Sequence, residues 1–387
     1  FTIIMANVRA ALRRQRILNQ RKDRLAILSE GVSSSDPADE LNKRLHSACD
    51  TGNLGDLERL VQAGADLESR HSQGLNSLML ASIRGYVAVV QKLLDAGANV
   101  EASTVGQATS LHMAARYGNE SVVQSLVGAG ANLEARTSKQ YTPLHWAATE
   151  GHDAVVQRLV DAGANLEAQE CDSQSTPLHL AAIEGHDAVV QRLLAAGANL
   201  EATNSLQCTP LHVAAFGGHT AVARVLLNAG ADLESKNCVS STPLHIAAGR
   251  GGYADVVRLL VAAGADKEAR LVAVGSDKEA MASLNLLTPL HIAALKDRRE
   301  AVSILLFAGA DTEGKTDDQH TALHIAARKG HVAVVRILLA SGADRTARRG
   351  DGASPLDLAL QNGHLGVAAL LQQETEPPQQ TALDELD

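Results

Sequence analysis

The sequence predicts an all-α protein built as a solenoid, in which short helical pairs stack one on another. Three observations predict this class: one four-residue motif recurs at a nearly constant spacing, two short amphipathic segments ending in glycine follow each copy, and large side chains are scarce. The chain is 45% hydrophobic but only 2% aromatic. We therefore expect a core of small aliphatic side chains at close helix spacing rather than large rings around a ligand cavity.

The recurring motif is Thr-Pro-Leu-His, with weaker copies towards both ends of the repetitive region. Ten copies end at His46, Met79, His112, His145, His179, His212, His245, His291, His324 and Asp357. Seven of the nine intervals between these residues are 33 residues long, one is 34 and one is 46. A fixed period of this length is typical of repeat architectures, in which each copy is one supersecondary unit.

The physical character of one unit is that of a helical pair. Thr142 is a good N-cap and Pro143 suits the first helical position, where no N–H partner is needed. Gly151 ends the first helix and Gly163 ends the second. One apolar stripe lies on each helix, formed by Leu144, Ala147 and Ala148 and by Val155, Val156, Leu159 and Val160. One unit cannot bury both stripes alone, so neighbouring units must stack to complete the core.

This pattern resembles the ankyrin-repeat family, whose TPLHxAA…G-H…VV…LL…GA-[DN] consensus matches nearly all of residues 41–372. The resemblance implies an all-α ankyrin-repeat solenoid of stacked helix-turn-helix units, with β-hairpin loops projecting at their sides and a curved groove. It also implies that the motif histidine hydrogen-bonds the backbone between adjacent units. The fifteen histidines are therefore expected to be structural rather than catalytic or metal-binding.

We divide the chain into three parts: a basic N-terminal helical arm and linker (1–40), an array of about ten repeats (41–372) and an acidic C-terminal tail (373–387). An insertion near 271–283 accounts for most of the excess length of the longest interval over the usual 33 residues. It is expected to be either a contact element or a passive bulge. Insertions in repeat arrays map to loops on one face.

Charge is unevenly spread between these parts. Residues 1–30 hold seven basic and two acidic residues, a net charge of +5, so the remaining chain carries −14 of the total of −9. An acidic body argues against general nucleic-acid binding, with the basic arm as the exception. The arm has three open roles: a cap on the first repeat, a contact with an acidic partner, or a contact with anionic lipid.

No motif of an enzyme or cofactor site is present. The sequence contains no G-x-x-x-x-G-K-[ST] loop, no G-x-S-x-G elbow and no H-E-x-x-H pair. No apolar run is long enough to cross a bilayer, and the apolar residues 1–5 are too few for a signal peptide. Four cysteines without C-x-x-C spacing fit reduced thiols: Cys49, Cys171, Cys208 and Cys238. We therefore expect a non-enzymatic protein without cofactor or metal, located in the cytoplasm, on the cytoskeleton or within a large complex.

Partner-binding residues are expected where the repeat does not dictate the residue. In the geometry that the resemblance implies, the two positions after Ala-Ala face the groove, which is acidic, then apolar, then basic along the chain. Interfaces concentrate binding energy in aromatic and Arg anchors. The candidate contacts in the groove and on the hairpins are Tyr117, Tyr141, Glu150, Glu184, Phe216, Arg250, Lys296, Arg328 and Lys329. The alternative for this face is an ordinary solvated surface.

These observations predict a non-catalytic scaffold or adaptor that binds other proteins, as a structural subunit of a larger intracellular assembly. The alternative is a regulatory inhibitor or effector that binds and blocks a single target protein. A subunit would co-purify with many proteins, whereas an inhibitor would bind one free target tightly.

Overall fold

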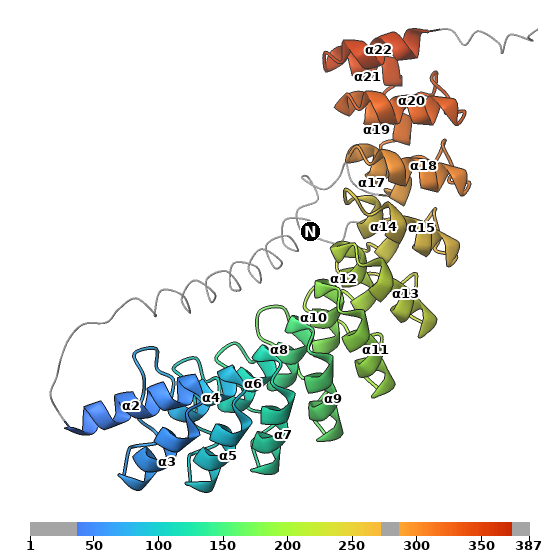
Figure 1. Ribbon diagram of the computed structural model, residues 1–387. Helices are drawn as coiled ribbons and strands as arrows, with labels where there is room; N and C mark the ends of the chain where they lie inside the picture. The colour runs from blue at the N-terminus through green and yellow to red at the C-terminus, as the bar shows by residue number, and fades with distance from the viewer. Residues whose placement is uncertain (1–36, 272–285, 374–387) are drawn as a thin grey trace, which may run out of the picture. The chain divides into compact units, whose positions relative to one another are not determined.

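The computed structural model describes residues 37–271 and 286–373, in which twenty helices follow one another as ten pairs (Figure 1). The predicted arm up to residue 36, the insertion from 272 and the tail from 374 lie outside the described residues. The first described helix begins at Pro37, four residues before the predicted start of the array, and the last described helix ends at Gln372. Among the described residues, no helix is long and apolar enough to span a membrane.

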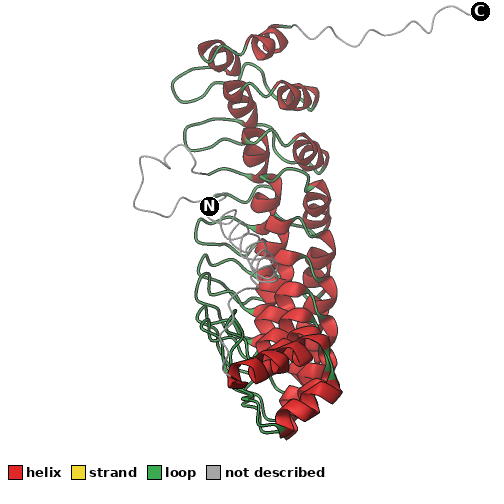
Figure 2. Ribbon diagram, turned by 60° about the vertical axis from the view of Figure 1, so that its left-hand side comes forward, coloured by secondary structure: helices red, strands yellow, loops and turns green. Residues whose placement is uncertain are grey.

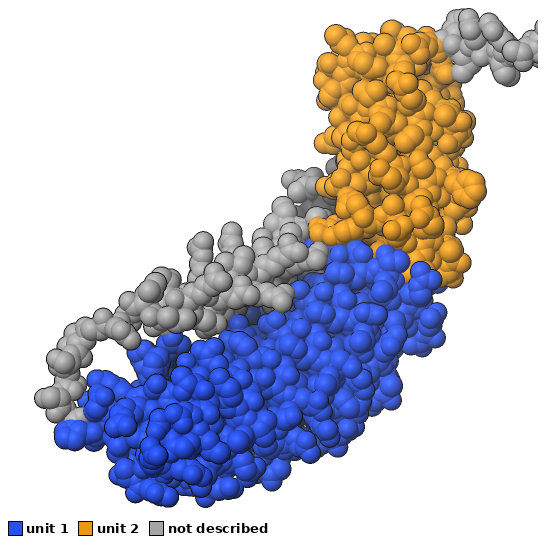
Figure 3. Space-filling view, viewed as in Figure 1, with its two compact units in different colours: residues 1–237 blue, residues 238–387 orange. Residues whose placement is uncertain are grey.

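The chain divides into two compact units, at residues 1–237 and 238–387 (Figure 3). This boundary falls inside a repeat loop, and the motif spacing gave no indication of it. In the described part of the first unit the helices are α2 (Pro37–Thr51), α3 (Leu54–Gln62), α4 (Ser77–Arg84), α5 (Val87–Asp95), α6 (Ser110–Tyr117), α7 (Glu120–Gly128), α8 (Pro143–Glu150), α9 (Asp153–Asp161), α10 (Pro177–Glu184), α11 (Asp187–Ala195), α12 (Pro210–Gly217) and α13 (Thr220–Asn228).

The second unit has the same construction. Its described helices are α14 (Pro243–Ala248), α15 (Ala254–Ala262), α17 (Pro289–Leu295), α18 (Arg299–Phe307), α19 (Ala322–Lys329), α20 (Val332–Ala340), α21 (Pro355–Gln361) and α22 (Leu365–Gln372). Within each unit, the first helix of a pair packs against the first helices of neighbouring pairs, and second helices pack against second helices. Long loops connect successive pairs at one edge of the helices (Figure 2).

The expected hairpin loops turn back on themselves with little regular strand pairing. Within residues 37–271 and 286–373, the β-structure is limited to one isolated antiparallel bridge between Ser103 and Thr109. The turn position of these loops requires a left-handed backbone, and glutamine occupies it at φ between 53° and 64° in five repeats: Gln107, Gln140, Gln174, Gln207 and Gln319. Left-handed backbone is unusual for a side chain with a Cβ atom.

The predicted capping of the first helices is confirmed. Thr142 is the N-cap of α8 and forms a reciprocal capping box with His145, while Pro143 occupies the first turn. The predicted apolar stripes are buried except for Val160, which is half-exposed; Leu144 and Val156 are both 0% exposed. Each fully buried Leu or Val side chain contributes about 1.5 to 3 kcal/mol, so the stacked stripes supply most of the cohesion between repeats.

The motif histidine joins each repeat to the next one within a unit. The backbone N–H of Thr176 donates to Nδ1 of His179 at 3.3 Å, and Nε2 of His179 donates to the carbonyl oxygen of Cys208 in the next loop at 2.9 Å. The same pair of bonds is made by His112, His145, His291 and His324. One buried imidazole therefore provides a hydrogen-bond partner both for a backbone N–H at the start of its own helix and for a backbone carbonyl in the following loop.

A second histidine position bonds in the opposite direction along the chain. Nε2 of His186 donates to the carbonyl oxygen of Thr149 in the preceding repeat at 3.0 Å. Gly151 lies beneath this ring: its φ is +80°, and a Cβ atom there would lie 2.6 Å from Nδ1 of His186. Glycine is thus required both for the left-handed helix end and for the close approach of the next repeat.

A row of glutamates forms a third set of bonds between repeats. Oε1 of Glu167 accepts the backbone N–H of Asn199 at 2.7 Å. Equivalent bonds join Glu68 to Asn99, Glu101 to Asn132, Glu134 to Asn165 and Glu313 to Asp344. These carboxylates are at exposed loop bases, so their bonds compete with water and contribute less than the buried histidines.

We predict that His179→Ala is more destabilising than Glu167→Ala. The histidine substitution leaves a cavity and an unpaired carbonyl in a site that is 1% exposed, at a cost of about 2 to 4 kcal/mol. The glutamate substitution frees an N–H that water can reach, at a cost of about 1 kcal/mol or less. Urea unfolding followed by circular dichroism measures both, and equal costs would contradict this ranking.

We predict that the fold loses stability as the pH falls from 6.5 towards 4. Burial lowers the pKa of His112, His145, His179 and His291 from 6.5 to about 4, because the charged imidazole is poorly solvated. In this window the unfolded chain binds protons that the folded chain does not, so the free energy of unfolding decreases with falling pH. Thermal unfolding at pH 7.5 and pH 5 checks the sign, and an unchanged midpoint would contradict it.

Candidate functional site

An aromatic and cationic cluster lies at the ends of α6 and α8 in the first unit. The guanidinium of Arg116 lies 4.7 Å from the ring centroid of Trp146 and 5.6 Å from that of Tyr117. It also lies 4.0 Å from a carboxylate oxygen of Glu150 on the next repeat. The Trp146 ring is 5.4 Å from that of Tyr141. Three predicted contact residues, Tyr117, Tyr141 and Glu150, therefore meet around Arg116 and Trp146.

Trp146 was not predicted as a site residue, although the sequence contained a signal for it. It is the only tryptophan and occupies the position after the motif histidine, where the equivalent residues include Met113, Leu180 and Val213. Its side chain is half-buried, and Tyr117 is 39% exposed. Aromatic side chains with one accessible face are typical binding anchors.

Two of the predicted contact residues, Phe216 and Tyr141, are buried in the structure. Phe216 is 1% exposed and Tyr141 is 7% exposed. Ile183, which is equivalent to Phe216 in the preceding repeat, is also buried at 4%. Burial removes the apolar surface of Ile183 and Phe216 from water, whereas the equivalent residues of other repeats stay half-exposed: Ile83, Arg116, Thr149 and Leu295.

Tyr141 has a structural role instead. Its carbonyl oxygen accepts the Nε2 proton of His112 at 3.0 Å, and its backbone N–H donates to Oγ1 of Thr137 at 3.1 Å. Burial raises the pKa of its phenol well above the usual value, with nearby Glu170 as a further cause. Glu184 remains half-buried on α10.

The second unit presents a group of basic side chains at the ends of its first helices. Lys296 follows α17, and Arg328 and Lys329 form the last turn of α19. Lys296 and Lys329 are exposed and Arg328 is half-buried. None of the three forms an ion pair with the residues that the structure describes. Arg250, the fourth predicted base, is half-buried with its guanidinium 5.7 Å from the ring centroid of Tyr253.

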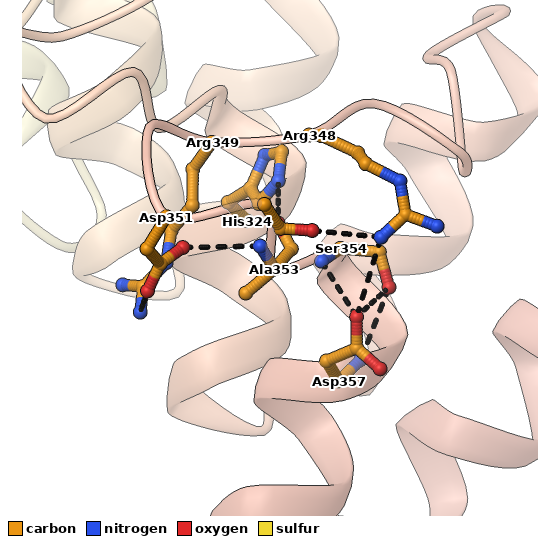
Figure 4. Close-up of polar contacts among 8 residues, drawn as sticks. His324, Arg348, Arg349, Asp351, Ala353, Ser354 and Asp357 are labelled. Carbon is orange, nitrogen blue, oxygen red and sulfur yellow. Dashed lines mark hydrogen bonds and ion pairs between the residues drawn. The ribbon is translucent and has the colours of Figure 1, made fainter.

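Two further arginines extend this charge onto the last loop, and the sequence analysis missed them (Figure 4). Arg348 donates to the carbonyl oxygen of Gly352 at 2.7 Å and lies 3.9 Å from a carboxylate oxygen of Asp357. Arg349 makes a two-point contact with Asp351. The Arg348-Arg349 pair in the sequence was the signal that could have identified them. We call Lys296, Arg328, Lys329, Arg348 and Arg349 the basic face.

The electrostatic effect of these bases is seen at His320. Nη1 of Arg349 lies 3.0 Å from Nε2 of His320. Burial lowers the pKa of His320 to about 4, and the positive charges of Arg328 and Arg349 act in the same direction. The loop and the end of α19 therefore share one region of positive potential.

Phe307, another residue that the sequence analysis missed, is an exposed aromatic at the end of α18. It is 97% exposed. Equivalent positions hold small or polar residues, among them Asp161, Ala195 and Asn228, so an aromatic there was the available signal. A single exposed aromatic ring does not by itself form a binding surface. Phe307 would add only to a contact made elsewhere in this unit.

One group in the described residues has the side chains of a metal site: Glu170, Cys171 and Asp172 in the loop before α10. The Glu170 carboxylate is buried and accepts the backbone N–H groups of Asp172, Ser173 and Ser175 at 2.6 to 3.0 Å. The Glu170 carboxylate thereby takes the place of the backbone turn that the other loops have. The repeat that contains this loop is one residue longer than the usual repeat. These bonds account for the burial of Glu170 without an ion.

Comparison with known proteins agrees with this geometry. A family model described as ankyrin repeats (3 copies) matches residues 45–137, 111–204, 178–271 and 290–381. Among the solved structures that match is a crystal structure of the human ASB11 ankyrin repeat domain, with 29% sequence identity and a TM-score of 0.51. The match covers 56% of this chain and 96% of that chain. No curated protein matches. The family model covers well over half of the sequence, and the chain belongs to the ankyrin-repeat family, whose members are generally protein-interaction modules of a typically non-catalytic fold.

Proposed function

We propose that this chain is a non-catalytic scaffold or adaptor, acting as a structural subunit of a larger intracellular assembly, and that the basic face is one of its contact surfaces. The observation that carries the proposal is the set of three bases without an ion pair among the described residues: Lys296, Arg328 and Lys329. They come from two adjacent repeats and have the same sign.

The fold alone does not account for these charges. Several bases elsewhere in the array bridge repeats through ion pairs, among them Arg84 with Asp50 at 2.8 Å and Arg158 with Glu120 at 2.8 Å. Such pairs offset the cost of placing charges near one another, whereas like charges on neighbouring repeats repel. The unpaired group therefore supports a role in binding rather than in stability.

The chemistry of the partner follows from the sign and spacing of the charges. Arginine and lysine on successive repeats favour a protein segment whose carboxylates are similarly spaced. The cluster around Arg116 and Trp146 in the first unit offers a different chemistry, with an aromatic face beside a carboxylate. An adaptor with two dissimilar surfaces can hold two different proteins, and this supports a subunit over a simple inhibitor.

We predict that replacing Lys296, Arg328 and Lys329 together by Glu weakens partner association at least tenfold. The reversal turns attraction for carboxylates into repulsion. The matched control replaces Arg258, Arg299 and Arg336, which are exposed on second helices of the same unit, with the same change in net charge. Association is measured by quantitative co-purification from native extract, and equal losses in both variants would count against the basic face.

The broader proposal is tested by crosslinking mass spectrometry of the protein in its native extract. Crosslinks from Lys296 and Lys329 to a recurring set of other proteins are expected for an assembly subunit. Crosslinks confined to the chain itself, together with monomeric sedimentation, would overturn the stable-subunit role.

A further inference from the structure

We propose that the basic face has a resident occupant in this chain: the acidic segment 374–387 binds back onto it and competes with external acidic partners. The inference rests on the proposed function, because it concerns the regulation of the same surface. Three features support it: the start of the segment is anchored, its charge is opposite to that of the basic face, and it is long enough to cross that face.

The starting point of the segment is held beside the basic loop. Nη1 of Arg345 donates to the carbonyl oxygen of Gln373, the last described residue. Arg345 lies in the same loop as Arg348 and Arg349, between α20 and α21. Gln373 is therefore tied to the loop that carries Arg348 and Arg349, and the segment begins at the next residue of the chain.

The charges of the two partners are opposite. Residues 374–387 contain five acids and no base: Glu374, Glu376, Asp384, Glu385 and Asp387. The basic face offers three bases without an ion pair among the described residues, together with Arg348 and Arg349. The carboxylates that those two arginines already contact, on Asp357 and Asp351, are themselves exposed by 46% and 55%. The single 3.9 Å contact of Arg348 is a weak exposed ion pair, so a competing carboxylate can exchange there, whereas Arg349 makes two bonds to Asp351 and is held more firmly.

The length of the segment is sufficient for this contact. Fourteen residues in extended form span up to about 46 Å, while neighbouring helices in a stack are about 10 Å apart. The segment can therefore reach from the last repeat to Arg328, Lys329 and Lys296 on the two preceding ones.

Tethering makes a weak contact effective. Exposed ion pairs contribute about 0 to 1 kcal/mol each, so a separate acidic peptide should bind the basic face weakly. A segment linked to the surface is present at an effective concentration of about millimolar. The resident segment thus occupies the face part of the time, and a partner must carry more or better-placed carboxylates to displace it. Proteins with too few carboxylates are therefore excluded from the basic face.

The test uses full-length chains and a fluorescein-labelled peptide with the sequence of residues 374–387 as the probe. In the first variant the resident acids become amides, by E374Q, E376Q, D384N, E385Q and D387N. Fluorescence anisotropy at low salt should show that this variant binds the probe two- to tenfold more tightly than the unmodified chain, since its own segment no longer competes. Adding K296E, R328E and K329E to this variant should abolish probe binding, whereas adding R258E, R299E and R336E should not.

The outcomes separate this inference from the proposed function. Equal affinity of the unmodified and amide chains, with binding lost only on reversal of the basic face, would overturn the resident segment and leave the face as an acidic-peptide site. No binding by the amide chain would overturn both the resident segment and the acidic-partner chemistry of the face.

A second measurement reports the contact directly in the unmodified chain. A zero-length carbodiimide crosslinker joins amines and carboxylates that touch, so dilute full-length protein should yield links from Lys296 or Lys329 to the carboxylates of residues 374–387. Links should be fewer to Lys267, which lies in a loop of the same unit. An equal yield at Lys267, or no link to the basic face, would contradict the proposal.

Discussion

The buried motif histidine is the interaction on which the rest of the array depends. It is held in its neutral form, with Nδ1 accepting from the backbone of its own helix start and Nε2 donating to the next loop, as at His179. Because both ring nitrogens are used, the ring fixes where the next repeat begins as well as where its own helix begins. Stacking of apolar stripes alone would allow repeats to slide, and these directional bonds set the register.

The last repeat of the described array shows what happens where this interaction has no second partner. In the last repeat Asp357 replaces the histidine: its carboxylate accepts the backbone N–H of Ser354 at 2.8 Å and completes the capping box. Up to Gln373, where the described part ends, no loop follows whose carbonyl needs a donor from this position, so an acceptor-only side chain is sufficient. The second histidine position needs only a donor to the preceding repeat, so it accepts other side chains that donate. Nδ2 of Asn119, for example, donates to the carbonyl oxygen of Ser82 at 2.7 Å.

Most of the fold could be predicted from the sequence because its determinants are local and repeated. Thr142, Pro143 and Gly151 each fix a backbone geometry that depends little on distant residues. The contact residues were less predictable, because whether a side chain stays exposed depends on its size and on the surface next to it. Repeat position correctly indicated where Phe216 sits but not that an apolar ring there is buried. Arg348 and Arg349 were missed because loop positions follow no helical period.

The exposed charges differ between the two units in a way that affects how each surface acts. In the first unit Arg116 is drawn inward by Trp146 and Glu150, so its charge is largely compensated within the repeats. In the second unit Arg349 lies 3.0 Å from His320, whose pKa is lowered first by burial and further by the charges of Arg328 and Arg349. Screening in physiological salt acts over about 8 Å, which is close to the spacing of neighbouring helices. Adjacent bases therefore reinforce one another, whereas isolated charges several repeats apart do not. A surface built in this way discriminates by the density of carboxylates in its partner more than by any single contact.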